Sequence, residues 1–565
     1  MNHAQPAPAD AAALDAAAEA EFSRLLGALQ DQRPLRHPEL REARRALDAN
    51  RPDIAAQLLT GFLRKHPGDA DALNLMADVL LRRERKAEAE ALLAQCVARA
   101  PNFDLARLNY ANVLQQMNKP AAALEQAEIL LRKQPAHPLY RDVQCTALSA
   151  MGRHEDSLAA RKALAGDYPG SSKVQVSYAQ VLRTSGKQEE CIAAFRKAVA
   201  INPAMGFAWW GLANLKTYTF DEDDIAQLQA QLSRKDLSAG DRLHLLFTLG
   251  KAFGDRGQYR ESFDAYARAN AARRLASNYD PASAPRQLAK FRSLYTPEFF
   301  AARMGSGAAS DAPIFVVGMQ RAGSTLLEQI LASHSAIEGA GEMAHTRFLA
   351  RRLEESLGPQ YGTDYPGVLA HIDVGEFRAL GEDYLAATLL RRPLGRPHFV
   401  DKDPFNFWHI GLYRLMLPKA RIIDIRRHPL GCCFSNFTSI FLHGLAHTYR
   451  LADLGRFYAN YVEMMAHYDR VLPGNVLRVH YEDLIGNPER EIRRVLDWLE
   501  LPFEAACLDF HANRRAVNSA SSEQVRTPLY KDALERWKHY EPWLGPLKEA
   551  LGPVLEKYPQ APEFS

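Results

Sequence analysis

The stretch IFVVGMQRAGSTLLEQI at 314–330 combines residue types that can hold an anion. An apolar run leads to Gly318, a short polar turn and Gly323, and the hydroxyl pair Ser324 and Thr325 then opens a helical pattern. If the apolar run is a strand and LLEQI starts a helix, the N–H groups and dipole of the helix N-terminus face the turn. The stretch therefore predicts an anion-binding turn. The plainer alternative is a strand, a turn and a helix with a capping serine.

The turn lacks the lysine that a nucleoside triphosphatase needs. In the pattern GxxxxGKS or GxxxxGKT, lysine reaches the β- and γ-phosphates and the hydroxyl holds magnesium. The spacing from Gly318 to Gly323 fits this pattern, but Ser324 follows Gly323 directly. Arg321 supplies a cation inside the turn instead, and Lys402 offers a second one at the end of a later apolar run. An anion other than a magnesium-bound triphosphate is therefore indicated.

The composition is that of an ordinary soluble protein. The 565 residues are 47% hydrophobic and 24% charged, and this length suggests about two to four domains. The net charge of +3 argues against a nucleic-acid protein defined by bulk charge. The six cysteines form no CxxC pair, which predicts a reduced protein without structural disulfides or zinc.

The first residues show no targeting pattern. MNHAQPAPADAAALDAAAEAEF has no basic region followed by an apolar core, and the chain has no run of about eighteen apolar residues. We therefore expect a cytoplasmic protein without a membrane span. The Ala/Pro-rich segment 1–35 is expected to be part helical, with its first twenty or so residues loosely ordered.

Three series of residues repeat with a step of 34. Prolines recur at Pro67, Pro101, Pro135, Pro169 and Pro203. Small residues recur at Ala43, Ala77, Ala111, Cys145, Ala179 and Ala213, and again at Ala55, Ala89, Ala123, Ser157 and Cys191. This period, with small residues where two helices cross closely, resembles the tetratricopeptide repeat, a pair of antiparallel helices that stacks into a superhelix. The resemblance implies a repeat array over 36–275, with a last helix pair at 242–275 after an irregular stretch near 216–240.

Such an array is either a scaffold or a surface that binds a peptide or protein partner, and the second reading is favoured. The segment 276–312, rich in Pro, Gly and Ser, is expected to be a connector. Four β-branched apolar runs follow, separated by helical segments, at 314–318, 398–402, 420–427 and 475–484. Strands that alternate with helices indicate a parallel α/β sheet. The expected architecture is thus an all-helical superhelix followed by a P-loop-like, three-layer α/β domain at 313–550 and a tail at 551–565.

Two segments of the α/β domain resemble the sulfotransferase family. GMQRAGSTLLEQIL resembles its 5′-phosphosulfate loop, and IIDIRRHPLGCCFSNF at 422–437 resembles its 3′-phosphate segment, with Arg427 ending a strand and Ser435 eight residues later. The resemblance implies binding of 3′-phosphoadenosine 5′-phosphosulfate as co-substrate, without metal. In the loop it implies cofactor binding by Gly318, Gln320, Arg321, Ala322, Gly323, Ser324 and Thr325.

The chain is most similar to the protein-tyrosine sulfotransferase branch and to its bacterial relatives with repeat arrays. The residues that carry this are Arg321, the pair Gly341-Glu342 and the KDP motif that starts at Lys402. Segments 479–489 and 519–537 resemble later parts that close over the nucleotide. They add Tyr481, Ser521 and Arg526 as cofactor-binding candidates. Gln320 and Ala322 replace the usual proline and serine, which leaves the acceptor open.

The resemblance assigns a role to each catalytic candidate. Arg321 and Lys402 would stabilise charge on the equatorial and leaving oxygens, and Glu342 would take the acceptor proton. Arg427 and Ser435 would bind the 3′-phosphate. The bland alternatives are a solvated Glu342, a surface ion cluster of Lys402 with its neighbouring aspartates, and strand-end arginines that meet solvent. A histidine base is a further alternative, with these candidates: His334, His345, His398 and His409.

Several functions remain open at this point. Peptide tyrosine presented by the array is the first choice of acceptor, and a small-molecule or saccharide hydroxyl is the second. A P-loop kinase and an inert adaptor are the rival classes. A homodimer is compatible with the sequence, and no nucleic-acid partner is expected.

Overall fold

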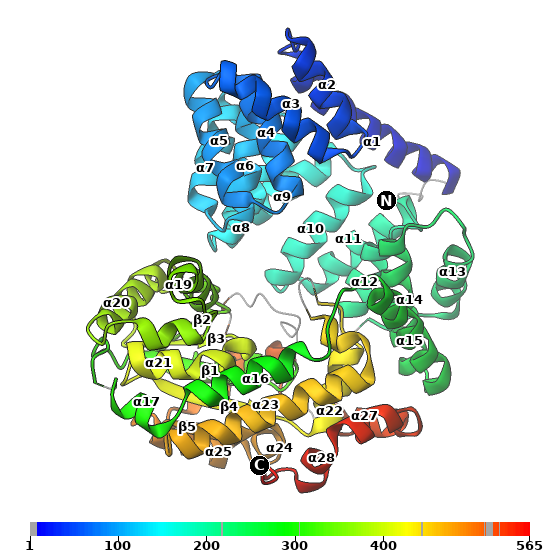
Figure 1. The fold of residues 1–565 in the computed structure, drawn as a ribbon. Coiled ribbons are helices and arrows are strands. Elements are labelled where there is room, and N and C mark those ends of the chain that lie inside the picture. The colour runs from blue at the N-terminus through cyan, green and yellow to red at the C-terminus, as the bar shows by residue number, and fades with distance from the viewer. Residues whose placement is uncertain are drawn as a thin grey trace. The chain divides into compact units, whose positions relative to one another are not determined.

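The computed structural model describes residues 8–215, 218–303, 305–441, 445–513, 515, 524–529 and 532–564. The chain divides into two compact units, Met1–Leu212 and Ala213–Ser565. Each unit is treated by itself below (Figure 1).

The first unit is a stack of helices. They are α1 (Pro8–Asp31), α2 (Pro38–Asp48), α3 (Pro52–Lys65), α4 (Ala70–Arg82), α5 (Lys86–Arg99), α6 (Asp104–Gln116), α7 (Pro120–Lys133), α8 (Pro138–Ala150), α9 (His154–Asp167), α10 (Ser172–Thr184) and α11 (Gln188–Ile201), with α12 (Gly206–Asn214) at the boundary between the units. Helices α4, α6, α8 and α10 start 34 residues apart, as the sequence period predicts.

The repeated small residues lie where the helices pack most closely. Ala55, Ala89, Ala123, Ser157 and Cys191 are all fully buried. Each repeated proline stands two residues beyond the end of a helix, as Pro67 does after α3. A larger side chain at the small positions would overlap the neighbouring helix, and proline cannot continue a helix interior. The predicted tetratricopeptide-like stack is therefore confirmed.

Two predictions about local order are wrong. The first twenty residues are not loosely ordered from Pro8 onward, because α1 begins there and buries Asp15. The stretch near 216–240 is not irregular throughout, because it contains α13 (Glu222–Leu232). Asp221 and Asp224 form a reciprocal capping box that satisfies the first N–H groups of α13.

The second unit contains a five-stranded parallel sheet. Its strands are β1 (Pro313–Gly318), β2 (Ile337–Gly341), β3 (His398–Lys402), β4 (Arg421–Arg426) and β5 (Val476–His480). Their order is β2-β3-β1-β4-β5, and each neighbouring pair is parallel. The strands at 314–318, 398–402 and 420–427 are confirmed. The run at 475–484 is a strand only as far as His480, because helix α24 (Tyr481–Gly486) begins directly after it. Strand β2, with the sequence IEGAG, was missed because glycine and alanine are poor strand formers.

Helices cover both faces of the sheet. The helices from β1 onward are α18 (Ser324–Leu331), α19 (His345–Tyr361), α20 (Glu376–Thr388), α21 (Ile410–Met416), α22 (Pro429–Phe437), α23 (Leu451–Val471), α24 (Tyr481–Gly486), α25 (Pro488–Trp498), α26 (Asp532–Glu535), α27 (Gly545–Leu551) and α28 (Pro553–Lys557). Short 3-10 helices span Gly367–His371, Leu389–Arg391, Pro404–His409, Ala446–Tyr449, Ala505–Cys507, Phe510–Ala512, Gln524–Arg526 and Arg536–Trp543.

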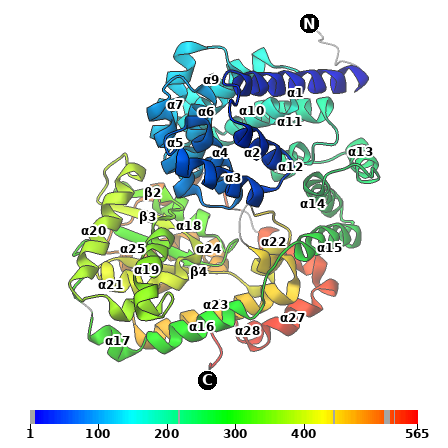
Figure 2. The ribbon, with the colours of Figure 1, turned by 45° about the horizontal axis from the view of Figure 1, so that its top comes forward.

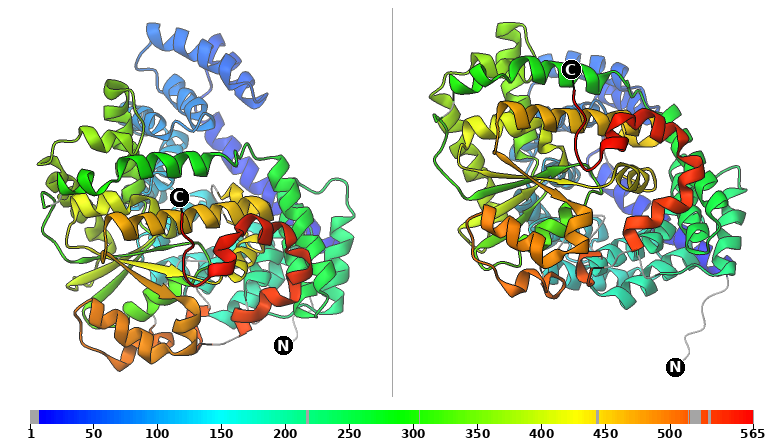
Figure 3. Two further views of the ribbon diagram at one scale, coloured as in Figure 1. Left: turned by 60° about the horizontal axis from the view of Figure 1, so that its bottom comes forward. Right: turned by 90° about the horizontal axis from the view of Figure 1, so that it is seen from below.

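The two faces of β1 separate the layers. Ile314 and Val316 pack in one core with side chains of α18, α24 and α25. Phe315 points the opposite way and stacks on Tyr413 of α21 at a ring distance of 3.6 Å. Figure 3 shows α23, in gold, on one side of the sheet and α25, in orange, on the other. The predicted three-layer α/β domain with a parallel sheet is therefore confirmed.

The predicted last helix pair belongs to the second unit. It consists of α14 (Ala239–Asp255) and α15 (Tyr259–Leu275), and α16 (Ser283–Leu294) and α17 (Pro297–Ala301) lead from it to β1. Buried Asn270 of α15 donates its amide to the carbonyl of Phe437 at 2.8 Å, and Ser262 bonds the hydroxyl of Tyr540 at 2.9 Å. The sequence-based domain limits, including residue 275, stay predictions.

Candidate functional site

Every strand of the sheet ends at a candidate residue. The anion-binding turn follows β1, Glu342 follows β2, Lys402 is the last residue of β3, Arg427 follows β4, and Tyr481 follows β5. The carboxyl ends of parallel strands share one edge of a sheet, and ligands of open α/β sheets bind outside that edge. The fold thus brings together, at one edge, residues as far apart in the chain as Arg321 and Tyr481, which are separated by 160 positions.

The turn after β1 has no room for side chains at its two glycines. Gly318 has a φ of +146°, and a Cβ there would lie 2.4 Å from the carbonyl oxygen of Ile425. Gly323 has a φ of +103°, and its Cβ would lie 2.5 Å from the ring of Tyr481. Arg321 also has a positive φ of 64°, which is uncommon outside glycine and marks a tightly constrained turn. Helix α18 begins at Ser324, so its N-terminus faces this turn.

Two guanidinium groups converge on the turn. The Nε of Arg321 donates to the hydroxyl of Ser435 at 3.1 Å. Arg427 donates to the backbone carbonyl of Arg321 at 3.1 Å, and its guanidinium lies 4.8 Å from the ring centre of Tyr481. We refer to Arg321, Arg427, Ser435 and Tyr481 as the loop cluster. Paired guanidinium forks beside a helix N-terminus suit a phosphate or sulfate group.

The remaining loop residues act through the backbone or by close packing. The carbonyl of Gln320 accepts from the amide of Asn436 at 2.7 Å and from the thiol of Cys432 at 3.2 Å. Ala322, Ser324 and Thr325 are buried. Asn436 is fully buried. The sequence analysis did not predict its role, although it follows the candidate Ser435 directly. It ties α22 to the turn.

Glu342 and Lys402 form an ion pair at the ends of β2 and β3. We refer to them as the base–cation pair. Lys402 is 2% exposed, whereas the side chain of Glu342 is 53% exposed. The pairing of Gly341 with Asp401 in the sheet sets this position. A carboxylate that reaches solvent beside a buried ammonium can accept a proton from an incoming hydroxyl.

The sequence neighbours of Lys402, Asp401 and Asp403, both carry buried carboxyl groups. Burial raises the pKa of Asp401 to about 8, although the hydroxyl of Tyr384 donates to it at 2.6 Å. Burial also raises the pKa of Asp403, against the lowering effect of Arg347. The alternative reading of Lys402 as part of a surface ion cluster is wrong, because Lys402, Asp401 and Asp403 are all buried.

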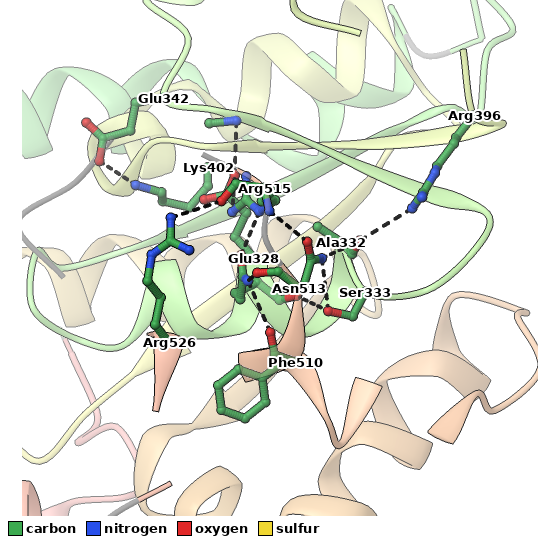
Figure 4. Close-up of polar contacts among 12 residues, drawn as sticks. Glu328, Ala332, Ser333, Glu342, Arg396, Lys402, Phe510, Asn513, Arg515 and Arg526 are labelled. Carbon is green, nitrogen blue, oxygen red and sulfur yellow. Dashed lines mark hydrogen bonds and ion pairs between the residues drawn. The ribbon is translucent and has the colours of Figure 1, made fainter. Parts of the chain in front are cut away.

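A polar network anchors the segment after Phe510 to α18 (Figure 4). Buried Glu328 accepts the N–H of Gly341 at 3.0 Å and pairs with Arg515 at 3.0 Å. Arg515 also donates to Gln329 at 2.7 Å. A Cβ at Gly339 would lie 2.6 Å from the guanidinium of Arg515, so that glycine makes room for it. The network holds the strand end beside Glu342 to the helix that follows the turn.

The last cofactor candidates lie on or near this segment. Arg526 donates to the backbone carbonyl of Arg515 at 3.4 Å, and burial lowers the pKa of Arg526. Ser521 lies outside the described residues. Glu328 and Arg515 were missed because their partners are up to 187 residues apart in the chain, and no local pattern reveals such a pairing.

The four histidine candidates are partly or fully buried. His334 is buried, lies 2.9 Å from the carbonyl of Pro502 and accepts the N–H of Ala336 at 3.1 Å. Burial lowers the pKa of His409 to about 3, and its ring bonds the hydroxyl of Tyr365. Burial also lowers the pKa of His345. Both ring nitrogens of His334 and the Nδ1 of His409 thus bond within the fold.

In the described part of the chain, no group of three or more His, Cys, Asp or Glu side chains is arranged to hold a metal ion. None of the helices described is long and apolar enough to cross a membrane.

Family models match both units. Residues 313–505 match the sulfotransferase family, and residues 40–103 and 172–205 match tetratricopeptide repeats. The class is therefore that of a sulfotransferase-family α/β domain preceded by tetratricopeptide repeats. Residues 313–505 are thus similar to the sulfotransferase family.

Known relatives cover the chain in part. An uncharacterized protein of Aquifex aeolicus (strain VF5) is 30% identical over 406 residues, which is 69% of this chain and 53% of that protein. The chain thus spans about half the length of this relative. Protein-tyrosine sulfotransferase A of Caenorhabditis elegans is 24% identical over 234 residues, 40% of this chain and 60% of that protein. The sulfotransferase domain of the Synechococcus PCC 7002 olefin synthase is 17% identical, covers 42% of this chain and 90% of its own, and superposes with a TM-score of 0.31.

Proposed function

We propose that the protein transfers a sulfuryl group from 3′-phosphoadenosine 5′-phosphosulfate to an acceptor hydroxyl. The observation that carries this proposal is the loop cluster. This cluster lies at a glycine turn that precedes a helix N-terminus and lacks the lysine of a triphosphatase. Its two arginines come from distant segments of the chain. A nucleotide with an anionic group at each end of its ribose suits such a divided set of donors.

The chain's residues fit both anionic groups. The N–H groups at the start of α18, with Ser324 and Thr325, suit the 5′-phosphosulfate. Arg427 and Ser435 suit the 3′-phosphate, and Tyr481, packed against Gly323 and Arg427, bounds the same space. Gly318 and Gly323 keep the backbone open to a ligand that a Cβ would crowd. Residues Gln320 and Ala322 contribute through the backbone and packing.

The base–cation pair supplies the acid–base chemistry. When bound, the nucleotide supplies a sulfuryl group on a phosphate leaving group. Glu342 takes the proton from the acceptor hydroxyl as its oxygen forms the new bond to sulfur. The bond from sulfur to the bridging oxygen breaks, its electron pair stays on the phosphate, and Lys402 and Arg321 stabilise that charge. No metal is required for these roles.

Peptide tyrosine is the acceptor that we favour. The similarity of the α/β domain to a protein-tyrosine sulfotransferase supports it, and the repeat array offers a surface that can hold a protein substrate or partner. A small-molecule or saccharide hydroxyl is the second candidate, because Gln320 and Ala322 depart from the tyrosine-specific pattern. We place the protein in the cytoplasm.

Calorimetric titration tests the nucleotide. We expect 3′,5′-adenosine bisphosphate to bind and Mg·ATP to bind at least about tenfold more weakly, because ATP lacks the 3′-phosphate. Arg427→Ala should weaken the bisphosphate by about tenfold to a hundredfold through loss of a charged hydrogen-bond donor. Arg352→Ala, which removes an exposed arginine of α19, is the control and should bind normally. Tight Mg·ATP binding without bisphosphate binding would make the domain a kinase.

Transfer of labelled sulfate tests the acceptor. Tyrosine peptides, simple phenols and saccharides are offered with the sulfated nucleotide in the presence of a metal chelator. We expect labelled tyrosine peptide, and label confined to phenols or saccharides would select the second acceptor class. An inert adaptor would bind the nucleotide and label none of the acceptors.

A further inference from the structure

Helix α1 lies along the junctions between successive repeats of the first unit. It contacts both α6 and α11, which belong to helix pairs two repeats apart (Figure 2). Its 24 residues span about 36 Å, at about 1.5 Å per residue. The N-terminal half of α1 meets the start of α10, and its C-terminal end meets the core around α4 and α6.

The carboxylate of Asp15 is fully engaged by the array. The N–H of Ser172 donates to it at 2.8 Å, the hydroxyl of Ser172 at 3.1 Å, and the side-chain amide of Asn202 at 3.1 Å. Asp15 is 8% exposed. Ser172 opens α10, so the helix dipole adds to the attraction. The array therefore binds a carboxylate with donors from the two ends of one repeat, the α10–α11 helix pair.

Further contacts continue along the same face of α1. Glu19 forms an ion pair with Lys173, and the ring of Phe22 packs on Tyr168 at 5.2 Å. Leu29 is 2% exposed and joins the core that contains Phe103 and Leu73. The contacting residues of α1 thus follow the spacing Asp-x3-Glu-x2-Phe-x6-Leu.

Helix α1 buries few residues for its length. Among residues 13–31, only Asp15 and Leu29 are buried. Its large apolar residues Leu14 and Leu26 are 49% and 39% exposed. Few buried apolar contacts mean a low free energy of local opening, so α1 can leave while the stacked repeats remain folded.

We propose that this face of the array is a docking surface for an acidic amphipathic helix of a partner protein, and that α1 is its resident intramolecular occupant. The partner presents a carboxylate to Ser172 and Asn202, a second acid to Lys173, and an aromatic and a leucine side chain further along the helix. The proposal deepens the binding role given to the array above and rests on that role. It is independent of sulfuryl transfer.

A labelled peptide tests the surface directly. The probe is a fluorescent peptide of residues 8–31, titrated by anisotropy in the absence of nucleotide. Three full-length proteins are compared: the unchanged chain, a weakened chain with Asp15→Ala, Phe22→Ala and Leu29→Ala, and a control chain with the exposed positions Arg24→Ala and Leu26→Ala. We expect the weakened chain to bind the peptide at least about tenfold more tightly than the other two, because its own α1 no longer occupies the docking surface.

A second peptide, with Asp15→Asn, should bind the weakened chain about tenfold more weakly, since it lacks the charge that the donors receive. Equal binding of the peptide by all three proteins, or of both peptides by the weakened chain, would overturn the proposal. Dimerisation of the unchanged chain through exchanged α1 helices would make a second copy the occupant and would also overturn it. Because no sulfuryl transfer is read, failure of the proposed reaction would leave these results unchanged.

Hydrogen exchange of the unchanged chain covers the case in which the weakened chain misfolds. We expect the amides of α1 to exchange well before those of α4 and α10. Protection of α1 equal to that of α4 and α10 would make it an integral part of the stack and would overturn the proposal.

Discussion

In the repeat unit, Ala55, Ala89 and Ala123 occupy equivalent positions in successive helix pairs, and each packs against helices that are near in the sequence. In the second unit, Arg321 bonds Ser435 and Arg427, which lie 114 and 106 residues further along the chain. The first arrangement is fixed by many small local contacts that resemble one another. The second depends on a few pairings, each made once. Changes in the two regions should therefore affect different properties.

The largest effect is expected at the solvent-reaching member of the base–cation pair. Glu342→Gln keeps the shape of the side chain but removes its basicity, so turnover should fall by about 10²–10⁴-fold with nucleotide affinity retained. Steady-state kinetics and calorimetry measure the two quantities. Glu355→Gln, an exposed carboxyl of α19, is the control. Full turnover in Glu342→Gln would remove this residue from the mechanism.

The second prediction addresses the network that anchors the segment after Phe510. Arg515→Ala leaves buried Glu328 without its cation, which should destabilise the second unit by about 3–5 kcal/mol. Calorimetric melting measures the change. Adding Glu328→Gln should recover part of the loss, because the uncompensated charge is then gone. If the double variant is no more stable than Arg515→Ala, charge is not the cause.

In the array, Ala123→Leu should lower stability by about 1–3 kcal/mol through overpacking at a fully buried helix crossing. The melting transition of the first unit should shift, while transfer to a short acceptor stays unchanged. Ala121→Leu, exposed on the same helix, is the matched control. Loss of transfer in Ala123→Leu would contradict the separation of the two regions.

The last prediction concerns stability, and its effect per pH unit is the smallest. Burial raises the pKa of Asp401 from near 4 to about 8. Between these values the native protein holds a proton that the unfolded chain releases, so stability falls as pH rises, by at most about 1.4 kcal/mol per pH unit. Asp401→Asn does not titrate and should gain stability relative to the unchanged protein from pH 5 to pH 8. Melting temperatures across this range measure it. Parallel curves for the two proteins would show that Asp401 is ionised in the native state.

Local patterns predicted most of the fold. The period of 34 gave the repeats, and β-branched runs gave four strands, because both depend on residues close together in the sequence. Strand β2 escaped because its pairing with β3, rather than its composition, makes it a strand. Helix α13 escaped because its capping box joins two aspartates in a stretch that lacks the repeat pattern.

The site was predictable where a motif marks it and hidden where tertiary contact alone defines it. Candidates such as Arg427 and Ser435 lie on segments with a family pattern, and the structure brings both to the turn. Asn436, Glu328 and Arg515 have roles set by partners on other segments, so only the fold reveals them. The chemical roles of the candidates stay predictions until the experiments above are done.

Helix α15 has a practical consequence for anyone who wishes to study the sulfotransferase-like domain without the repeats. Its buried Asn270 bonds the carbonyl of Phe437, two residues beyond Ser435, and Ser262 bonds Tyr540. A shortened protein that starts at the first strand would expose this surface and loosen the end of α22. A shortened protein that starts near residue 213 would keep α15 and both of these hydrogen bonds.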